Sequence, residues 1–416
     1  MFRSNCGGWI AGDATYSIAL PDGRTLWLFG DSFIGTALPD SSIAPGADMI
    51  RNCGVIQTGD SLHALYGGTF DNPTDFIPPP QPDSSWFWPE NGLVENDTLK
   101  IFMSEFITNN GPPGWNFEFH NTYLVFLSFP DLSLLGMEVL PYHAQNSVMY
   151  GNQVMADGGF NYIYGRRDGP NNTANAHVAR VPQGSIQAPW EFYTGAGWSS
   201  DPATSAWITF QAVSQQYAVF RHEQKYVMLT QDIWLGTKIF TLTANTPVGP
   251  WGNKTEIYNT PLPFPTQLTY NAWAHPQFDE ENQLLVSYNS NGDFWSIFSN
   301  VELYRPTFIR VPFEMIDSTF LPTNINSLMP ESDDDVVLFQ NFPNPVSQMT
   351  TFALDLRKRQ YISLELFNTF GIKVTSFVNK ELPPGHYEFS EDLSDLDAGI
   401  YFYRLDNLVK KLLKNE

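Results

Sequence analysis

Two aspartates at the ends of one predicted hairpin are the first candidates for chemistry. The stretch Trp9–Gly35 reads WIAGDATYSIALPDGRTLWLFGDSFIG, with two apolar, aromatic-rich runs around the turn Pro21-Asp22-Gly23. Asp-Gly between strand-like runs is a strong hairpin signal. Asp13 precedes the body of the first run, and Asp31 follows the second. Because the far ends of an antiparallel hairpin meet, the sequence predicts two carboxyl groups side by side.

Four further stretches repeat this hairpin pattern. They are WPENGLVENDTLKIFMSEF, YGNQVMADGGFNYIYGRRD, FQAVSQQYAVFRHEQKYVMLTQD and NAWAHPQFDEENQLLVSYNSN. Each leaves room for two more strands before the next copy, and WSIFSN and YRPTFIRVPF are the outer-strand candidates after the last one. Units of four strands at such a period are typical of propeller blades. We therefore predict an all-β protein with a five-bladed β-propeller over residues 1–320; an irregular β-sandwich or barrel is the alternative.

The propeller pattern predicts a rim of polar and aromatic side chains on one face. The start of each innermost strand and the end of the next strand share that face, because the two strands are antiparallel. The carboxylate candidates for catalysis are Asp13, Asp31, Glu90 and Glu105. The candidates for substrate binding are Trp9, Trp88, Asn152, Arg166, Asp232, Trp273, His275 and Asn289. Carboxylates and amides bond to hydroxyl groups and aromatic faces stack on sugar rings, so this rim favours a polysaccharide or oligosaccharide ligand.

Paired carboxyl groups are what glycoside hydrolysis requires. One stays ionised as base or nucleophile, and the other carries the proton that the leaving group takes. A close second carboxylate raises one pKa and so supplies the acid. The structural alternatives are that Asp13 closes a turn, that Asp31 caps a loop, and that Glu90 and Glu105 are solvated or paired with arginine. A non-catalytic glycan-binding or adhesive propeller would use the same side chains. No Gly-x-Ser-x-Gly elbow or Cys/His nucleophile arrangement supports another hydrolytic chemistry.

Composition restricts the partners. The net charge is −22, and residues 1–335 hold 13 basic and 34 acidic residues, a net charge of −21. Such a domain repels nucleic acid and suits neutral ligands.

No apolar run approaches the length of a membrane span. No metal-ligand spacing occurs, so we predict no metal site and no cofactor, although a propeller channel can hold Ca²⁺ on carboxylate and carbonyl oxygens. Cys6 and Cys53 would pair only in an oxidising compartment.

The C-terminal region differs in composition from the propeller. Residues 321–335, LPTNINSLMPESDDD, predict a linker, and residues 336–416 alternate as the strands of a small, immunoglobulin-like β-sandwich. The motifs LFQNFPNPVSQMTTFALDL, LELFNTFGIKV, LPPGHYEF and LDAGIYFYRL occur in order. This region resembles the C-terminal sorting domain of the type IX secretion system of Bacteroidota. The resemblance implies contact with that machinery and a secreted or cell-surface protein. It also implies an upstream signal peptide; none is visible, so we expect the N-terminus to be incomplete.

The propeller also resembles a known group. GGWIAGDATYSIALPDGRTLWLFGDSFIG, FWPENGLVENDTLKIFMSEF, GPWGNKTEIY and HPQFDEENQLLVSYNSN are similar to bacterial propeller domains that include endo-D-arabinanases. Their architecture is like that of the five-bladed arabinanase, fructosidase and xylosidase hydrolases. The resemblance implies that Asp13, at the start of the first innermost strand, is the base or nucleophile. It leaves Asp31, Glu90 and Glu105 as candidates for the acid. We therefore expect a secreted glycoside hydrolase for a neutral polysaccharide, with an arabinan as the first candidate.

Overall fold

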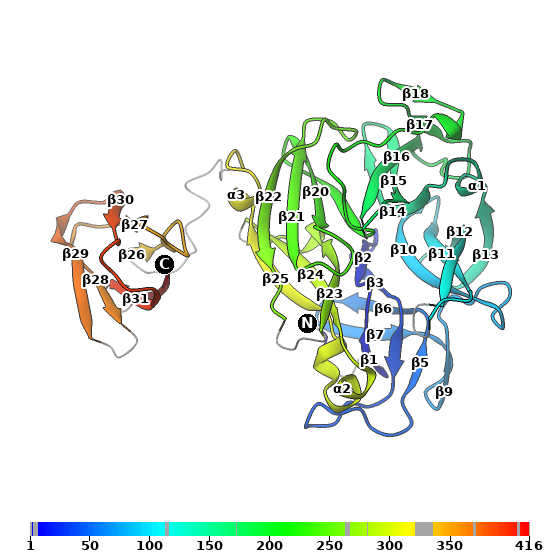
Figure 1. Cartoon of the computed structure of the whole chain (residues 1–416), viewed down its shortest axis with the longest axis horizontal. Helices are drawn as coiled ribbons and strands as arrows, with labels where there is room; N and C mark the ends of the chain where they lie inside the picture. The colour runs from blue at the N-terminus through cyan, green and yellow to red at the C-terminus, as the bar shows by residue number, and fades with distance from the viewer. Residues whose placement is uncertain are drawn as a thin grey trace. The chain divides into compact units, whose positions relative to one another are not determined.

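The computed structural model of the chain has two compact units, Met1–Thr323 and Asn324–Glu416 (Figure 1). It describes residues 2, 7–112, 116–171, 173–262, 267–280, 282–320, 336–368, 372–405 and 408–415. The predicted linker, residues 321–335, lies outside these residues. Within them, no helix combines the length and the apolar character needed to cross a membrane.

Five antiparallel sheets follow one another along the N-terminal unit. The first holds β2 (Tyr16–Ala19), β3 (Thr25–Phe29), β6 (Cys53–Thr58) and β7 (Ser61–Leu65). The second holds β10 (Ser85–Glu95), β11 (Thr98–Thr108), β12 (Phe117–Ser128) and β13 (Leu134–Leu140). The third holds β14 (Met149–Asp157), β15 (Phe160–Asp168), β16 (Ala174–Pro182), β17 (Glu191–Tyr193) and β18 (Trp198–Ser199). The fourth holds β19 (Tyr217–His222), β20 (Lys225–Gln231), β21 (Lys238–Ala244) and β22 (Gly252–Asn259). The fifth holds β23 (Leu268–Ala274), β24 (Gln283–Asn291) and β25 (Thr307–Pro312).

The sheets form a closed ring, which confirms the predicted propeller. The first strand of each sheet, β2, β10, β14, β19 and β23 in turn, contacts the first strand of the next. The ring closes between the fifth and first sheets, where the rings of Tyr16 and Trp273 lie 4.4 Å apart. There Ser17 Oγ also lies 2.7 Å from His275 Nδ1. Apolar side chains of neighbouring sheets pack against one another and form the core.

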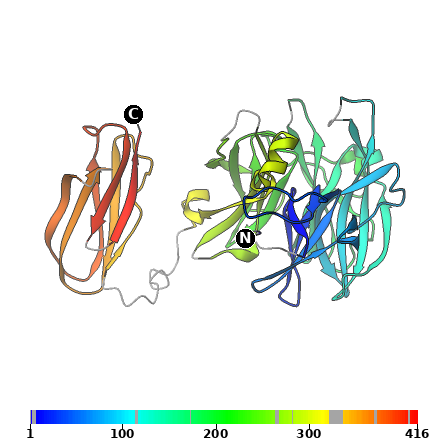
Figure 2. The same ribbon diagram turned by 90° about the horizontal axis from the view of Figure 1, so that it is seen from below.

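The fifth sheet differs from the prediction. The segment WSIFSN is not an outer strand but most of α2 (Phe294–Ser299), which is followed by η3 (Val301–Tyr304). The Asp293 side chain caps this helix by accepting from Ser296 N at 3.0 Å, and this local cap overrides the short apolar run. The amide of Ile43 in turn donates to the carbonyl of Phe298 at 2.9 Å. The helical segment therefore lies against the first part of the chain, as Figures 1 and 2 show.

The first hairpin has the predicted turn, with β2 paired to β3. Beyond a break in the pairing, the same two chain segments pair again, as β1 (Trp9–Gly12) with β4 (Ser32–Ile34). A third strand, β5 (Asp48–Ile50), pairs with the other edge of β4. Asp13 and Asp31 therefore lie at a break within a longer hairpin rather than at its end. The remaining short elements are β8 (Gly67–Thr69), β9 (Asn72–Thr74), α1 (His143–Asn146), η1 (Pro202–Thr204), η2 (Pro276–Phe278) and α3 (Phe313–Ile316).

The C-terminal unit is a β-sandwich of two sheets. One holds β26 (Val336–Leu338), β27 (Met349–Leu356) and β30 (Gly385–Asp392). The other holds β29 (Lys373–Leu382), β28 (Gln360–Asn368), β31 (Gly399–Leu405) and β32 (Leu408–Lys414). Alternating apolar side chains from both sheets form its core. The strands predicted for residues 336–416 are thus confirmed within the part of this unit that the structure describes.

Candidate active site

The break in the first hairpin fixes the position of Asp13. Ala14 and Thr15 have φ values of 68° and 60°, a strained backbone conformation for residues other than glycine. Asn289 stabilises it from the fifth sheet, donating from Nδ2 to Thr15 Oγ1 at 3.0 Å. Across the break, Gly30 N donates to the Asp13 carbonyl at 3.0 Å. A Cβ on Gly30 would lie 2.5 Å from Asp13 Oδ1, so glycine leaves the space that this carboxyl group occupies.

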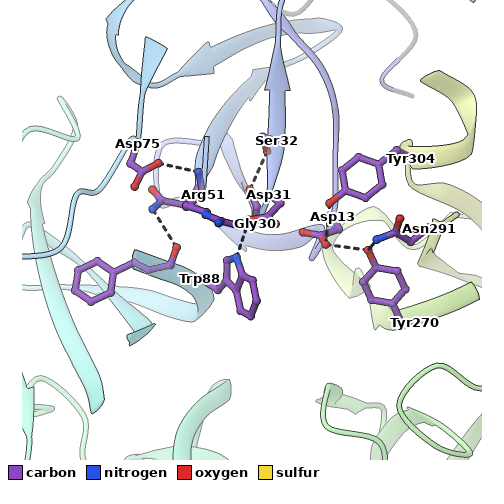
Figure 3. A network of polar contacts seen from close by, with 12 residues as sticks. Asp13, Gly30, Asp31, Ser32, Arg51, Asp75, Trp88, Tyr270, Asn291 and Tyr304 are labelled. Atoms are coloured by element: carbon purple, nitrogen blue, oxygen red, sulfur yellow. Dashed lines mark hydrogen bonds and ion pairs between the residues drawn. The ribbon is translucent and has the colours of Figure 1, made fainter. Parts of the chain in front are cut away.

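Two tyrosines hold the carboxyl group of Asp13. The hydroxyls of Tyr270 and Tyr304 donate to Asp13 Oδ2 at 2.8 and 3.1 Å, and Figure 3 shows both rings beside it. Burial raises the pKa of Asp13 to about 7, and the nearby carboxylate of Asp31 adds to the rise, although the two tyrosines oppose it. Asp13 is therefore a carboxylic acid that keeps its proton close to neutral pH.

Asp31 lies beside a positively charged partner, whereas the partners of Asp13 are neutral. Arg51 Nη1 lies 3.1 Å from Asp31 Oδ2, and Trp88 Nε1 donates to Oδ1 at 2.9 Å (Figure 3). Burial raises the pKa of Asp31, while Arg51 and Trp88 both counteract that rise. Arg51 is itself held in place: its amide donates to Asp75 Oδ1 at 2.7 Å, and its guanidinium lies 4.8 Å from the ring centroid of Trp86. Of the two aspartates, Asp31 is thus the one beside a positive charge, and it ionises first.

Two cavities meet at Asp13. The lateral cavity, of about 590 Å³, has both aspartates, Arg51, Trp86 and Tyr304 in its wall. The axial cavity, of about 370 Å³, has Glu90 and Arg166 in its wall. Residues common to both walls are Asp13, Trp88, Phe117, Trp234 and Tyr270. Two carboxyl groups with different proton affinities thus line a cleft with aromatic walls, an arrangement able to carry out acid–base chemistry on a ligand.

Glu90 reaches the axial cavity but forms a buried ion pair. Its Oε1 accepts from Arg166 Nη1 at 3.1 Å and from Ser104 Oγ at 2.9 Å. Asn152 supports the same group, since its Oδ1 accepts from Arg166 Nη1 at 3.2 Å. A carboxylate that balances a buried guanidinium is needed in its charged form. The arrangement therefore favours a structural role for Glu90 and Asn152 over the roles predicted for them as acid and ligand contact.

Six other predicted site residues line neither of these cavities. Glu105 is buried and accepts from Asn121 Nδ2 at 3.2 Å. Trp9, in β1, is buried against the first sheet, where its indole centroid lies 4.5 Å from the ring centroid of Phe29. Asp232 Oδ1 lies 3.4 Å from the amide of Lys238 and closes the loop that ends its own hairpin.

The other three belong to the fifth sheet or follow its first strand. Trp273 is buried against Tyr16. His275 lies between Ser17 and Ser287, and burial lowers its pKa to about 3, so it is a neutral structural histidine. Asn289 likewise bonds to Thr15 and stabilises the backbone break in the first hairpin. These six side chains lie outside the two cavities because the pattern gave their order along the strands but not the direction in which each points.

Sequence reasoning missed three residues of the site. Tyr304 follows a helix that was expected to be a strand, so nothing placed it near Asp13. Arg51 precedes β6 in a loop without a motif, and Trp234 lies in the loop after β20. The scarcity of basic residues in the propeller was the one available signal for Arg51.

No metal site is apparent in the described ranges, where no three His, Cys, Asp or Glu side chains are grouped as ligands. Cys53 is buried, and Cys6, its candidate partner in an oxidising compartment, lies outside those ranges.

Comparisons with known proteins agree with this fold. Residues 1–328 match the family described as a domain of unknown function (DUF5005), and residues 340–415 match the secretion system C-terminal sorting domain. No curated protein sequence matches the chain. A crystal structure described as a "putative hydrolase" from Bacteroides ovatus is 21% identical with a TM-score of 0.62, over 74% of this chain and 87% of that one.

Two more distant solved structures are glycosidases. An α-L-arabinofuranosidase from Lactobacillus brevis is 11% identical with a TM-score of 0.42, over 73% of this chain and 90% of its own. An exo-β-1,3-galactanase from Clostridium thermocellum has the same identity and TM-score, over 73% of this chain and 59% of its own. The sorting domain indicates secretion or export to the cell surface. The chain belongs to the DUF5005 family and joins that propeller to a secretion sorting domain.

Proposed function

We propose that this protein is a secreted glycoside hydrolase that uses Asp13 as general acid and Asp31 as the ionised base or nucleophile. The observation that carries the proposal is the contrast between these neighbouring carboxyl groups. One accepts from two neutral tyrosines, and the other lies beside Arg51. Their environments favour different protonation states, which is the requirement of glycoside hydrolysis.

The contacts suggest how the proton is placed. Both tyrosine hydroxyls donate to Asp13 Oδ2, which leaves Oδ1 as the oxygen able to carry the acidic proton. As the glycosidic C–O bond breaks, that proton passes to the leaving oxygen. In an inverting reaction, water adds to the anomeric carbon and gives its proton to Asp31. In a retaining reaction, Asp31 first bonds to the anomeric carbon; water then displaces the Asp31 carboxylate and gives its proton to the ionised Asp13, which restores the acid. The residues provide every group in this scheme, so it needs no cofactor. The family resemblance implied that Asp13 is the base or nucleophile. The proposal instead assigns Asp13 the role of general acid.

The walls of the cleft favour a neutral sugar chain. Trp86, Trp88, Phe117 and Trp234 offer aromatic faces for sugar rings. The net charge of −21 over residues 1–335, the propeller with its linker, disfavours anionic polymers. An arabinan is the first substrate to test, on the basis of the resemblance alone. The sorting domain fits export through the type IX machinery.

The test is a panel of neutral polysaccharides, including D-arabinan, L-arabinan and fructan, with products separated by chromatography. We expect one of them to be hydrolysed, and Asp13→Asn to lower the rate by about 10²–10⁴-fold while the protein still binds the polymer. Glu105→Gln is the matched control, because Glu105 lines neither cavity, and it should keep full activity. Full activity in Asp13→Asn would refute the assignment. Retention of a polysaccharide without hydrolysis by the wild type would favour the glycan-binding alternative.

A further inference from the structure

A third cavity, of about 590 Å³, lies at the other end of the propeller channel. We infer that this distal cavity is a second carbohydrate site, which binds one neutral sugar unit independently of hydrolysis. Its wall is formed by the later parts of the five innermost strands and by the loops that follow them, including Asn91, Gln153, Trp273 and Gln277.

The order of residues along the strands separates this cavity from the candidate active site. In the second sheet, Glu90 lines the axial cavity and Asn91 the distal one. In the fifth sheet, Tyr270 lines the axial cavity and Trp273 the distal one. Irregularities in strand pairing mark the change in both strands, between Pro89 and Gly92 and between Tyr270 and Trp273. The distal cavity shares no lining residue with the other two, so a ligand there does not contact Asp13 or Asp31.

Amide groups supply the hydrogen bonds that a sugar needs. Gln153 Nε2 donates to Asn91 Oδ1 at 3.2 Å, and Gln277 Nε2 donates to Ser17 Oγ at 2.6 Å. These bonds orient the side chains and leave Gln153 Oε1, Gln277 Oε1 and Asn91 Nδ2 without a protein partner among the described residues. Two acceptors and one donor around the cavity match the hydroxyl groups of a pyranose or furanose ring.

The charge of the wall selects a neutral ligand. Within the described residues, Glu95 is the single charged side chain that lines the distal cavity. Its carboxylate is already engaged, because it accepts from Lys100 Nζ at 3.2 Å, from the amide of Gly184 at 2.6 Å and from Asn161. No lysine or arginine of the described part lines the cavity, so an anionic sugar would meet no counter-charge.

The experiment uses the full chain carrying Asp13→Asn, so that no probe is consumed. Xylobiose, lactose and maltose are titrated by calorimetry, with digalacturonic acid as the anionic counterpart. We expect at least one neutral disaccharide to bind, and Gln277→Ala and Gln153→Ala each to weaken that binding about three- to tenfold, as loss of one neutral hydrogen bond does. Gln187→Ala, an exposed glutamine outside all three cavities, is the matched control and should change nothing.

Trp88→Ala decides which cavity holds the sugar, because Trp88 lines only the other two. Binding that persists in Trp88→Ala and weakens in Gln277→Ala supports the distal site. Binding lost in Trp88→Ala and unchanged in both glutamine variants would overturn it, and so would preference for the anionic probe or no binding of any neutral one. Melting temperatures of the variants establish that they are folded. Hydrolysis of a soluble substrate should be unchanged in Gln277→Ala, so failure of this site is distinct from failure of the proposed function.

Discussion

The first and second hairpins of the propeller carry the same pattern of acidic residues in different surroundings. In the first, Asp13 accepts from Tyr270 and Tyr304, and its pKa is raised to about 7. In the second, Glu90 bonds to Arg166 and Ser104. The ladders also differ, because the first hairpin is interrupted at its aspartates, whereas β10 and β11 remain paired with one irregularity near Glu90. Acidic residues at equivalent positions of different sheets therefore do not share one function.

The difference lies in what each carboxyl group does for the fold. Glu90 satisfies a buried cation, so the folded state needs its charge. Asp13 has no cation among the partners described here, and burial makes its charge unfavourable. A group that the fold tolerates at a cost is a candidate for function, and one that the fold requires is a candidate for structure.

Removing Glu90 should produce the largest loss of stability. Its side chain and that of Arg166 are 6% and 5% exposed, and their nearest charged atoms are 3.1 Å apart. Glu90→Ala leaves the buried guanidinium with only the largely exposed carboxylate of Asp168, 3.9 Å from its Nε, as counter-charge. We therefore expect the free energy of unfolding to fall by about 3–5 kcal/mol. Denaturant unfolding followed by tryptophan fluorescence measures this for the propeller alone, because residues 336–416 contain no tryptophan.

The double variant Glu90→Met/Arg166→Met is the control for this interpretation. It removes both charges and keeps much of the volume, so most of the lost stability should return. If the double variant is as unstable as Glu90→Ala, the loss comes from packing rather than from an unpaired charge, and the contrast between the hairpins is weakened.

Asp13→Asn should have the opposite effect on stability. The folded-state pKa of Asp13 lies above the ordinary value of 3.8, so the wild type loses stability as the pH rises from about 4 to about 7. The amide does not ionise and avoids this loss. At pH 8 we expect the variant to be more stable by about 1–4 kcal/mol, a range that allows for the partial exposure of Asp13.

The same fluorescence measurement at pH 4 and pH 8 tests the sign. The gain should be present at pH 8 and nearly absent at pH 4, where Asp13 is largely protonated in the folded state. A variant that is less stable than the wild type at pH 8 would show that the charge of Asp13 is useful to the fold, as that of Glu90 is.

The sequence was sufficient to predict the repeated hairpins but not the arrangement of side chains in the candidate active site. Turns such as Asn96-Asp97 and Asp157-Gly158-Gly159 marked the hairpins because their chemistry is local. The hairpin geometry predicted that Asp13 and Asp31 lie side by side. The position of Trp88 shortly before Glu90 predicted that it lies near the site. Tyr304, in contrast, reaches Asp13 across 291 residues of chain and only because α2 replaces a strand.

The partners of the acids decided their roles, and partners distant in sequence leave no local pattern. Arg51 approaches Asp31 from a loop, and Arg166 approaches Glu90 from the third sheet. Nothing in the spacing of the carboxylates distinguished the one beside tyrosines from the one beside arginine. The same limit explains why His275 and Asn289 were assigned to the ligand, although both bond only within the fold.

The smallest effect is expected from Tyr270→Phe, and it is the most informative about the role of Asp13. The tyrosine hydroxyl favours the ionised carboxylate, so its removal should raise the pKa of Asp13 further. If Asp13 is the general acid, activity is lost as the pH rises through this pKa, and the alkaline limb of the kcat/KM profile should move to higher pH. If Asp13 were the base, the acidic limb would move to higher pH instead. Tyr193→Phe, whose hydroxyl bonds to the Gly195 carbonyl away from the cavities, should leave both limbs in place. The direction in which each limb moves thus assigns acid and base to the two aspartates without relying on how much activity the variant retains.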